Sequence, residues 1–412
     1  MNEINIELFP ASYGESILVS CKGNNKTNIM IDMGFVSTYN NITKDRLKDL
    51  KDKNECINLL VFTHLDADHI SGGIPFFKEN GNWKKNNIID IEEIWFNSVK
   101  HFKIDAEKVQ LNDREKIILK SICSKRYPKE LYVSSSNDIS CEQGLTLSKL
   151  IKEHGYKWNE NLIMKSDSGK LSEIIINNEV KIIILSPTQR KLDDLIDVWK
   201  EQLLAMGIKD KLKESSEYDD AFELLMVNSN QVTRKAELKD CSLSIKDIEE
   251  LASEENFIED KDRVNGSSIS FILEFYDKKI LFLADSHPSI IEEGLNCYRN
   301  NTNEKICFDA VKISHHGSDG NTSVRLLNMI KCKKFIISTN GFKFDHPGNK
   351  TIARIISSNP DVHKLIISNY NTKAIKNFIN NKSLKEKYNY EICYTNESNI
   401  PNKKCNITDI VI

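Results

Sequence analysis

The chain has 412 residues, of which 40% are hydrophobic and 28% are charged, a composition typical of globular proteins with a buried core. Lysine and arginine number 57 and aspartate and glutamate number 60, so the formal net charge is −3. This balance excludes a strongly basic protein that holds nucleic acid by bulk electrostatic attraction, although a local basic patch is compatible with it. No apolar run approaches the roughly 18 residues of a membrane span, and the N-terminus lacks the regions of a signal peptide, so we expect a cytoplasmic protein without a membrane partner.

The ten cysteines are scattered along the chain, and none forms a Cys-x-x-Cys pair. This argues against a zinc site built from cysteine and favours reduced, buried thiols. The cysteines are Cys21, Cys56, Cys123, Cys141, Cys241, Cys297, Cys307, Cys332, Cys393 and Cys405.

The first 100 residues have the pattern of short strands separated by turns. Alternation predicts a strand over residues 4–8, and two further strand-like runs, 16–20 and 28–31, flank a Gly-Asn-Asn turn. Residues 57–62 are a continuous apolar run of the kind that is buried on both faces, and residues 91–96 form another short candidate strand.

The middle of the chain is predicted to be mainly helical. Residues 144–153 space their leucine and isoleucine side chains like one helix face, whereas residues 180–185 form a buried-strand run. Residues 188–264 combine helical spacing with dense charge, and we predict a mainly helical insertion there. An insertion, a cap and a partner-binding surface all fit this segment, and the sequence leaves the choice open.

From residue 267 the strand pattern returns, with helical stretches between most strands. The predicted strands are 269–275, 280–284, 310–314, 335–339 and 365–368, and the predicted helices are 288–296, 323–330 and 351–358. Because no low-complexity linker is evident, we expect 1–187 and 265–412 to be two halves of one fold, separated by the insertion at 188–264.

The strongest chemical signal follows directly on the apolar run 57–62. Four side chains that can bind metals lie within six residues there, namely His64, Asp66, Asp68 and His69. Imidazoles and carboxylates in such a cluster suit a divalent cation. The alternative is a polar loop that caps a helix, with Asp68 as the N-cap residue. Two histidines and two aspartates beside a Gly-Gly pair make that alternative the less favoured one.

Further candidate ligands follow later strands. Asp285 ends the predicted strand 280–284, His315 and His316 end the next strand, and His346 comes just after the one that follows. Because each strand delivers its last side chain to one rim of a sheet, residues far apart in sequence can converge on one site. A pair of metal ions about 3.5–4 Å apart can clamp the attacking and the leaving oxygen.

With this pattern the chain resembles hydrolases of the metallo-β-lactamase fold, an αββα sandwich, and within them the subgroup similar to the hydrolase domain of the DNA-uptake protein ComEC. The motif His-x-Asp-x-Asp-His at 64–69 carries the aspartate at its third position that is typical of this subgroup. The subgroup's later landmarks follow in order, as Asn265-Gly-Ser-Ser268, Ala284-Asp285, His315-His316-Gly317-Ser318 and His346-Pro347. Gly14-Glu15-Ser16 and Ile31-Asp32-Met33-Gly34 fit its first hairpins, and the resemblance covers roughly residues 1–100 and 265–370.

The resemblance implies two divalent metal ions, manganese or zinc. The implied ligands are His64 and Asp66 for the first ion, Asp68 and His69 for the second, Asp285 as the bridge and His346 to complete one shell. Asp32 would orient a histidine from behind by a hydrogen bond. The general family supplies one further histidine ligand before the bridging aspartate, and the chain offers none at a strand end there, so His315 or His316 is expected to compensate.

The remaining candidates would act on the substrate. Asp68 would orient the nucleophilic hydroxide or accept its proton. The residues expected to contact the substrate phosphate or to protonate the leaving oxygen are His315, His316, Lys312, Ser318 and Asn265. A solvated strand-edge lysine is the alternative for Lys312, and a helix N-cap is the alternative for Ser318.

The two adjacent histidines are assigned by strand alternation. Extending the strand 310–314 places His315 on the buried face, toward the metals, and His316 on the face of Lys312, toward the substrate. Gly317 permits a sharp turn, so the alternation could already end at His316.

The leading interpretation is a metal-dependent phosphodiesterase, a nuclease acting on DNA or RNA. Relatives in the subgroup also occur beside bacterial antiviral defence genes, which makes a defence or DNA-processing role and a protein partner at the insertion plausible. One alternative is a hydrolase of a small nucleotide, phosphoester or lactone. Another is a partner-binding scaffold with a vestigial site, although the intact ligand set argues against it.

Overall fold

The computed structural model describes residues 2–102, 110–128, 130, 145–166, 170–208, 215–229, 243–300, 302–394 and 407–412. Cys141, Cys241, Cys405, Gly144 and the parts 209–214 and 230–242 of the predicted insertion lie outside these described residues. The chain divides into two compact units. Unit 1 comprises Met1–Thr27, Met164–Gln189 and Thr233–Ile412, and unit 2 comprises Asn28–Ile163 and Arg190–Val232.

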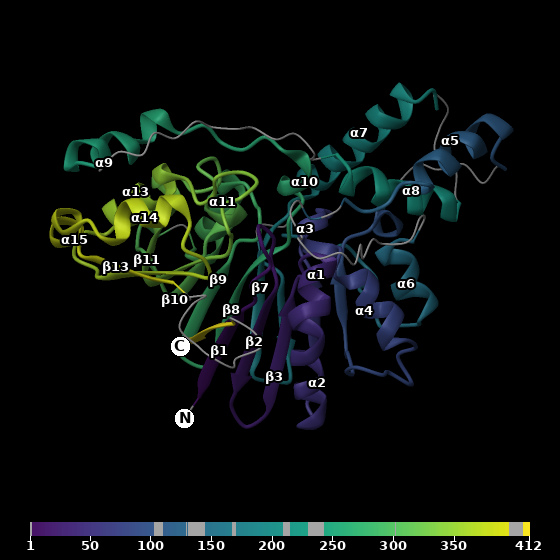
Figure 1. Cartoon of the computed structure of the whole chain (residues 1–412), viewed down its shortest axis with the longest axis horizontal. Helices are drawn as coiled ribbons and strands as arrows, with labels where there is room; N and C mark the ends of the chain where they lie inside the picture. The colour runs from purple at the N-terminus through teal and green to yellow at the C-terminus, as the bar shows by residue number, and fades with distance from the viewer. Residues whose placement is uncertain are drawn as a thin grey trace. The chain divides into compact units, whose positions relative to one another are not determined.

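Unit 1 is built on an eight-stranded sheet with the order β13-β12-β11-β10-β9-β8-β7-β6 (Figure 1). Its strands are β6 (Glu173–Ile176), β7 (Val180–Ser186), β8 (Ser270–Phe275), β9 (Lys278–Phe282), β10 (Ile306–Lys312), β11 (Ile330–Ile337), β12 (Lys364–Ser368) and β13 (Tyr390–Tyr394). The strands from β9 to β13 run parallel, so their carboxyl ends meet at one edge. The strands from β6 to β9 pair antiparallel.

Three more strands of unit 1 pair antiparallel in the order β14-β1-β2, namely β14 (Thr408–Val411), β1 (Glu3–Leu8) and β2 (Ile17–Lys22). Hydrogen bonds tie the β1–β2 hairpin to the larger sheet at two places. The amide of Asn340 donates to the carbonyl of Ser12 at 2.8 Å, and the carboxylate of Glu179 accepts from the amides of Asn24 and Asn25 at 3.1 and 3.0 Å. Two sheets are thereby joined in one unit.

Unit 1 also contains a series of helices, several of which share a core with the eight-stranded sheet. They are α9 (Ile245–Leu251), η3 (Glu254–Asn256), α10 (Arg263–Gly266), α11 (Pro288–Tyr298), η4 (Ser314–Gly317), α12 (Val324–Met329), α13 (Asn349–Ser357), α14 (Lys373–Ile379) and α15 (Lys382–Tyr388). Val311 and Phe335 of the sheet share one buried core with Ile291, Ile352 and Ile375 of the helices. Helix α9 packs against α13, so the last part of the predicted insertion belongs to unit 1.

Unit 2 contains the parallel strands β3 (Lys26–Ile31), β4 (Leu59–Phe62) and β5 (Ile94–Phe96). Its helices are α1 (Val36–Thr38), the π-helix η1 (Tyr39–Thr43), α2 (Lys44–Asp52), α3 (Ala67–Ile70), α4 (Gly73–Asn80), η2 (Val99–His101), α5 (Asp113–Cys123), α6 (Leu147–Glu153), α7 (Gln189–Ala205) and α8 (Ser216–Val227). The buried rings of Phe62 in β4, Phe96 in β5 and Phe77 in α4 pack together.

The helices of the predicted insertion share a core with the rest of unit 2. Helix α8 contacts α5 and α6, and the ring of Phe222 packs against Trp199 at 5.2 Å and against Phe102 at 6.0 Å. The units divide the stretch 188–264 between them, so a single insertion there stays a prediction. The mixed α/β class with two sheets and many helices is confirmed. Within the described ranges, no helix has both the length and the apolar content needed to cross a membrane.

Replacing Phe222 by alanine should lower the free energy of unfolding by about 3–5 kcal/mol, because it removes a fully buried ring from between two aromatic neighbours. Urea unfolding followed by tryptophan fluorescence measures this loss. The control is Ile117→Ala on α5, where the side chain is 69% exposed and the expected change is within about 0.5 kcal/mol. A loss below 1 kcal/mol for Phe222→Ala would show that α8 contributes little to this core.

Candidate metal-binding site

The first cluster lies in unit 2, where β4 ends and the short helix α3 begins. The strand is buried along its whole length, so the polar residues that follow it are delivered to its carboxyl end. His64 and His69 are buried, Asp66 is 8% exposed and Asp68 is half-buried. Asp66 is the N-cap residue of α3 but makes no side-chain capping hydrogen bond. The alternative with Asp68 as the N-cap is therefore wrong, since Asp68 lies within the helix.

Asp32 organises this cluster from behind. Its Oδ1 accepts a hydrogen bond from the amide of Thr63 at 2.8 Å, and its Oδ2 accepts one from the Thr63 hydroxyl at 2.7 Å. The same Oδ2 lies 2.7 Å from Nδ1 of His69. Because an ionised carboxylate only accepts, the Nδ1 of His69 carries its proton, and Nε2 is left as the nitrogen that can bind a metal.

Thr63 fixes the second imidazole in the same way. Its single hydroxyl proton is donated to Asp32, so Oγ1 must accept from the Nδ1 of His64, which lies at 3.0 Å. His64 therefore also presents Nε2 as its basic nitrogen. The two rings lie 4.2 Å apart, and Nε2 of His64 is 3.4 Å from Oδ2 of Asp66. Two imidazoles of defined tautomer and a carboxylate are a donor set that fits a divalent metal ion.

The second cluster lies in unit 1, beyond the carboxyl ends of β9 and β10. Oδ2 of Asp285 is 3.6 Å from Nε2 of His315 and 3.9 Å from Nε2 of His316. Nδ1 of His316 donates to the carbonyl of Ser338 at 2.8 Å, and Nδ1 of His315 faces Oδ1 of Asn321 at 3.0 Å. Both partners are acceptors, so both imidazoles again direct Nε2 toward one carboxylate.

Asp260 supports His315, and the sequence analysis missed it. Its Oδ2 accepts from Nδ2 of Asn265 at 2.8 Å and of Asn321 at 3.1 Å, and it lies 3.5 Å from Nδ1 of His315. Burial disfavours the charged imidazole, but Asp285 and Asp260 together raise the pKa of His315 to about 10 in the metal-free protein. Asp260 lies in the acidic stretch assigned to the insertion, where no pattern distinguished it from its neighbours.

The strand alternation used to separate the two adjacent histidines does not extend to them, so the division of their roles stays a prediction. Val311 and Ile313 do share a face, but that face packs against the helices. The strand β10 ends at Lys312, and both histidines have left-handed backbones, with φ of 46° for His315 and 55° for His316. The side chain of His316 is 2% exposed and that of His315 is 21% exposed, so His316 is the deeper of the two.

Neither Lys312 nor Ser318 fits the alternative role stated for it in the sequence analysis. Lys312 is buried, and its Nζ lies 2.6 Å from Oε2 of the buried Glu15, so it is not a solvated lysine. This ion pair does not favour a contact of Lys312 with substrate. The N-cap of α12 is Ser323, so Ser318 does not cap that helix.

His346 lies beside this second cluster. The centroid of its ring is 5.3 Å from that of His315, and the ring stacks on Phe344 at 5.7 Å. Burial and the charge of His315 lower the pKa of His346 to about 3, so its imidazole is neutral, as a metal ligand must be.

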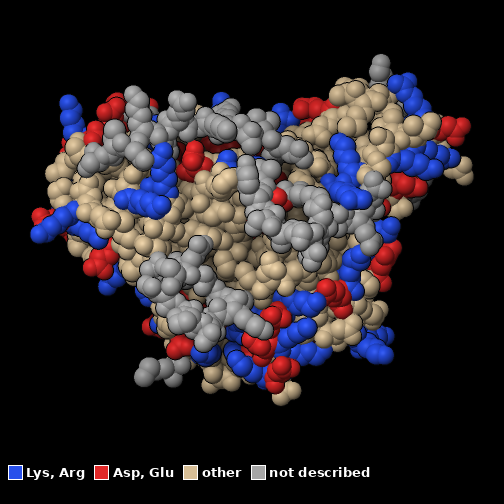
Figure 2. Space-filling view, in the orientation of Figure 1, with Lys and Arg blue, Asp and Glu red and all other residues tan. Residues whose placement is uncertain are grey.

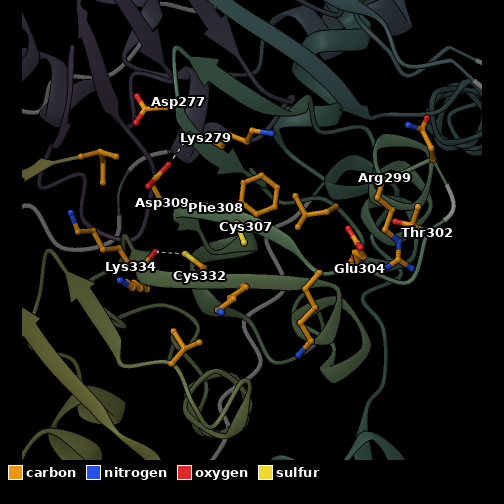
Figure 3. Close-up of a pocket in the computed structure, with 17 residues that line it drawn as sticks. Asp277, Lys279, Arg299, Thr302, Glu304, Cys307, Phe308, Asp309, Cys332 and Lys334 are labelled. Atoms are coloured by element: carbon orange, nitrogen blue, oxygen red, sulfur yellow. Dashed lines mark hydrogen bonds between the residues drawn. The ribbon is translucent and has the colours of Figure 1, made fainter. Parts of the chain in front are cut away.

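A cavity of about 730 Å³ lies at the amino ends of β10 and β11. Figure 3 shows Lys279, Arg299, Glu304, Asp309 and Lys334 around it. It is lined by the first residues of β10 and β11, whereas Asp285 and the histidines follow the last residues of β9 and β10. None of the predicted ligands lines it, so this cavity is separate from the candidate metal site.

Comparisons with known proteins relate the stretch that contains the first cluster to a known superfamily. Residues 11–122 match the family model of the metallo-beta-lactamase superfamily, and this stretch contains Asp32 and the whole motif 63–69. No curated protein matches the chain. Among solved structures, the chain is similar to a long form RNase Z from yeast, with 11% identity and a TM-score of 0.31. That match covers 96% of this chain and 44% of the other, so the chain spans less than half of that protein's length.

Replacing Thr63 by valine should weaken metal binding about 10–100-fold, as is typical when a group that orients a metal ligand is lost. Valine keeps the shape of the side chain but cannot accept from Nδ1 of His64 or donate to Asp32. Titration calorimetry with Mn²⁺ and Zn²⁺ on chelator-treated protein measures the affinity. Thr63→Ser is the matched control, because it keeps the hydroxyl and should bind like the wild type. Equal affinity for both variants would refute the role of the hydroxyl.

The two adjacent histidines should separate in the opposite sense to the alternation argument. His316→Ala should lower metal affinity at least about tenfold, because the ring is buried and anchored through Nδ1. His315→Ala should change metal affinity much less and lower turnover, because its ring is the more exposed. Metal titration and steady-state kinetics on both variants decide this, and the reverse pattern would return the roles to the earlier assignment.

Proposed function

We propose that this protein is a metal-dependent phosphodiesterase of the ComEC-like type that cleaves nucleic acid. The observation that supports this most is the protonation pattern set by Asp32 and Thr63, which leaves Nε2 of His64 and His69 basic beside a carboxylate. This cluster lies within the stretch that matches the metallo-beta-lactamase superfamily, whose members typically bind divalent metals.

The resemblance implies His64, Asp66, Asp68, His69, Asp285 and His346 as metal ligands, and we take His316 as the histidine that compensates for the family's further ligand. The donor set is mixed imidazole and carboxylate, which suits Mn²⁺ or Zn²⁺ better than a purely oxygen-bound ion. Bound divalent ions would lower the pKa of water and offset charge on a phosphoryl group.

The protein's own side chains would then position the reacting groups. Asp68, half-buried at the mouth of the motif, accepts a proton from the attacking water. His315 is held by Asn321 and Asp260 and is the more exposed of the two adjacent histidines, and it contacts a phosphoryl oxygen through Nε2. Asn265 holds Asp260 in place and so acts on substrate indirectly. Glu15 forms an ion pair with Lys312, and its Oε2 lies 3.5 Å from Nδ1 of His316. Glu15 thereby helps to fix the orientation of that imidazole ring.

Surface charge is compatible with binding through local contacts. On the face shown in Figure 2, basic and acidic residues are interspersed over the described surface. With a formal charge of −3, the chain would rely on a few specific contacts to hold a polyanion. A protein partner at 188–264 and a defence setting stay predictions.

The test is a substrate panel with protein reconstituted with Mn²⁺. Bis-p-nitrophenyl phosphate, its monoester, single-stranded DNA, duplex DNA, RNA, cyclic nucleotides and a lactone are compared at equal metal saturation. We expect the diester and at least one nucleic acid to be cleaved, and Asp285→Asn to lower the rate at least about 100-fold. Asp277→Asn, in the β8–β9 turn, is the matched control. Cleavage of the lactone or of cyclic nucleotides alone would contradict the proposal.

Activity should be higher with Mn²⁺ than with Zn²⁺ at equal saturation. Asp66, Asp68 and Asp285 contribute carboxylates to the proposed ligand set. Hard oxygen ligands shift the metal preference of a site from zinc toward manganese. Initial rates on the diester, measured with each metal after its affinity is known, check this. Equal or greater activity with Zn²⁺ would contradict it.

A further inference from the structure

The loop that precedes His346 carries an exposed aromatic side chain. Residues 340–346 lie between β11 and α13 and read Asn-Gly-Phe-Lys-Phe-Asp-His. Phe342 is 54% exposed, whereas Lys343 and Phe344 are half-buried. An exposed aromatic ring therefore lies on the loop that carries a proposed metal ligand.

The loop is held in place by hydrogen bonds. The amide and the side chain of Asn340 donate to the carbonyl and hydroxyl of Ser12 at 2.8 and 2.7 Å, and Oδ1 of Asn340 accepts from the amide of Phe342 at 3.0 Å. Gly341 has a φ of 73°, and a Cβ there would lie 2.8 Å from the carbonyl oxygen of His346. The chain therefore folds back on itself tightly, and the position of Phe342 is fixed by its own loop.

The two residues that follow Phe342, Lys343 and Phe344, pack against further aromatic rings. The ring of Phe344 packs edge-on against Tyr13 at 6.3 Å and stacks on His346 at an interplanar angle of 26°. Nζ of Lys343 lies 4.6 Å from the centroid of Phe344 and 5.3 Å from that of Tyr13. The loop thus offers an exposed ring and a lysine on a rigid support.

We propose that Phe342 and Lys343 form a stacking platform for a nucleobase of a single-stranded substrate, next to His346. This rests on the proposed function and names the substrate class of that site. Base stacking on an aromatic ring combined with a lysine for the phosphate is the arrangement by which proteins bind single strands without reading sequence. In a duplex the base faces are covered, so the platform selects against double strands. A docking protein would need a wider apolar surface than one ring flanked by a lysine.

The experiment measures binding of oligonucleotides that contain 2-aminopurine, whose fluorescence is quenched on stacking. Stopped-flow mixing with the metal-loaded protein records quenching before cleavage, and the measurement is repeated with EDTA. We expect Phe342→Ala to weaken binding of the single strand about 10-fold and Phe342→Trp to retain it. Lys343→Gln should reduce the slope of log affinity against log salt by about 1.

Trp83→Ala is the matched control. Trp83 is also an exposed ring, at 49%, with a lysine, Lys84, 5.4 Å from its centroid, but its loop carries no predicted ligand. We expect this variant to bind the single strand like the wild type. The same oligonucleotide as a duplex and a 2-aminopurine mononucleotide are measured beside this variant. The platform is supported if quenching of the single strand or of the mononucleotide is lost in Phe342→Ala.

The platform is overturned if Phe342→Ala binds like the wild type, if Trp83→Ala loses as much, or if the duplex binds as tightly as the single strand. Hydrolysis of bis-p-nitrophenyl phosphate, which has no base, separates this from the proposed function. A wild type that cleaves the diester but does not quench the strand refutes the platform alone. Quenching that depends on Phe342 without any diester cleavage refutes the phosphodiesterase and leaves the platform.

Discussion

Anchoring of imidazole rings through Nδ1 is the constraint on which the candidate site depends. In unit 2, the rings of His69 and His64 are held by Asp32 and by Thr63. In unit 1, the ring of His316 is held by a main-chain carbonyl and that of His315 by an asparagine. Each anchor is an acceptor toward the ring, so each ring carries a proton on Nδ1 and directs Nε2 away from its anchor. A metal site needs neutral imidazoles of one tautomer, and the contacts of Asp32 and Thr63 favour that tautomer in His69 and His64.

The fold supplies the anchors because parallel strands end together. Buried apolar runs force their polar successors to one edge, as Thr63 follows β4 and Ser314 follows β10. Left-handed backbones at Asp32, Ala284 and the two adjacent histidines then turn side chains out of the strand direction. Such conformations cost free energy for residues other than glycine, and these four fall at or beside positions that carry the candidate chemistry. The fold tolerates them because the strands on either side are well packed.

Much of the fold could be predicted from local patterns. The apolar run 57–62 contains β4, and the helix predicted at 288–296 is α11, where proline at the first position and amphipathic spacing mark the start. Strand β11 runs from Ile330 to Ile337 and so begins before the predicted strand 335–339, because lysines interrupt the apolar run in its first half. The division of the chain into compact units was harder to predict, because the contacts of α8 and α9 with helices distant in sequence leave no local pattern.

The site could be predicted only as far as residue type and strand end allow. The metal-binding residue types were visible as motifs, but their supporting partners were not. Asp260 and Asn321 act through side-chain geometry that joins distant segments, and no sequence pattern marks the role of Thr63. The backbone turn at His315 and His316 could not be derived from alternation, because alternation holds only while the strand continues.

The most direct measurement is a crystal structure of the protein soaked in Mn²⁺, with the ions located by anomalous scattering. We predict two ions, with Nε2 of His64 and of His69 among the ligands and Nδ1 of both rings still bound to Thr63 and Asp32. Coordination through Nδ1, or a fully soaked crystal without an ion at these imidazoles, would contradict the account.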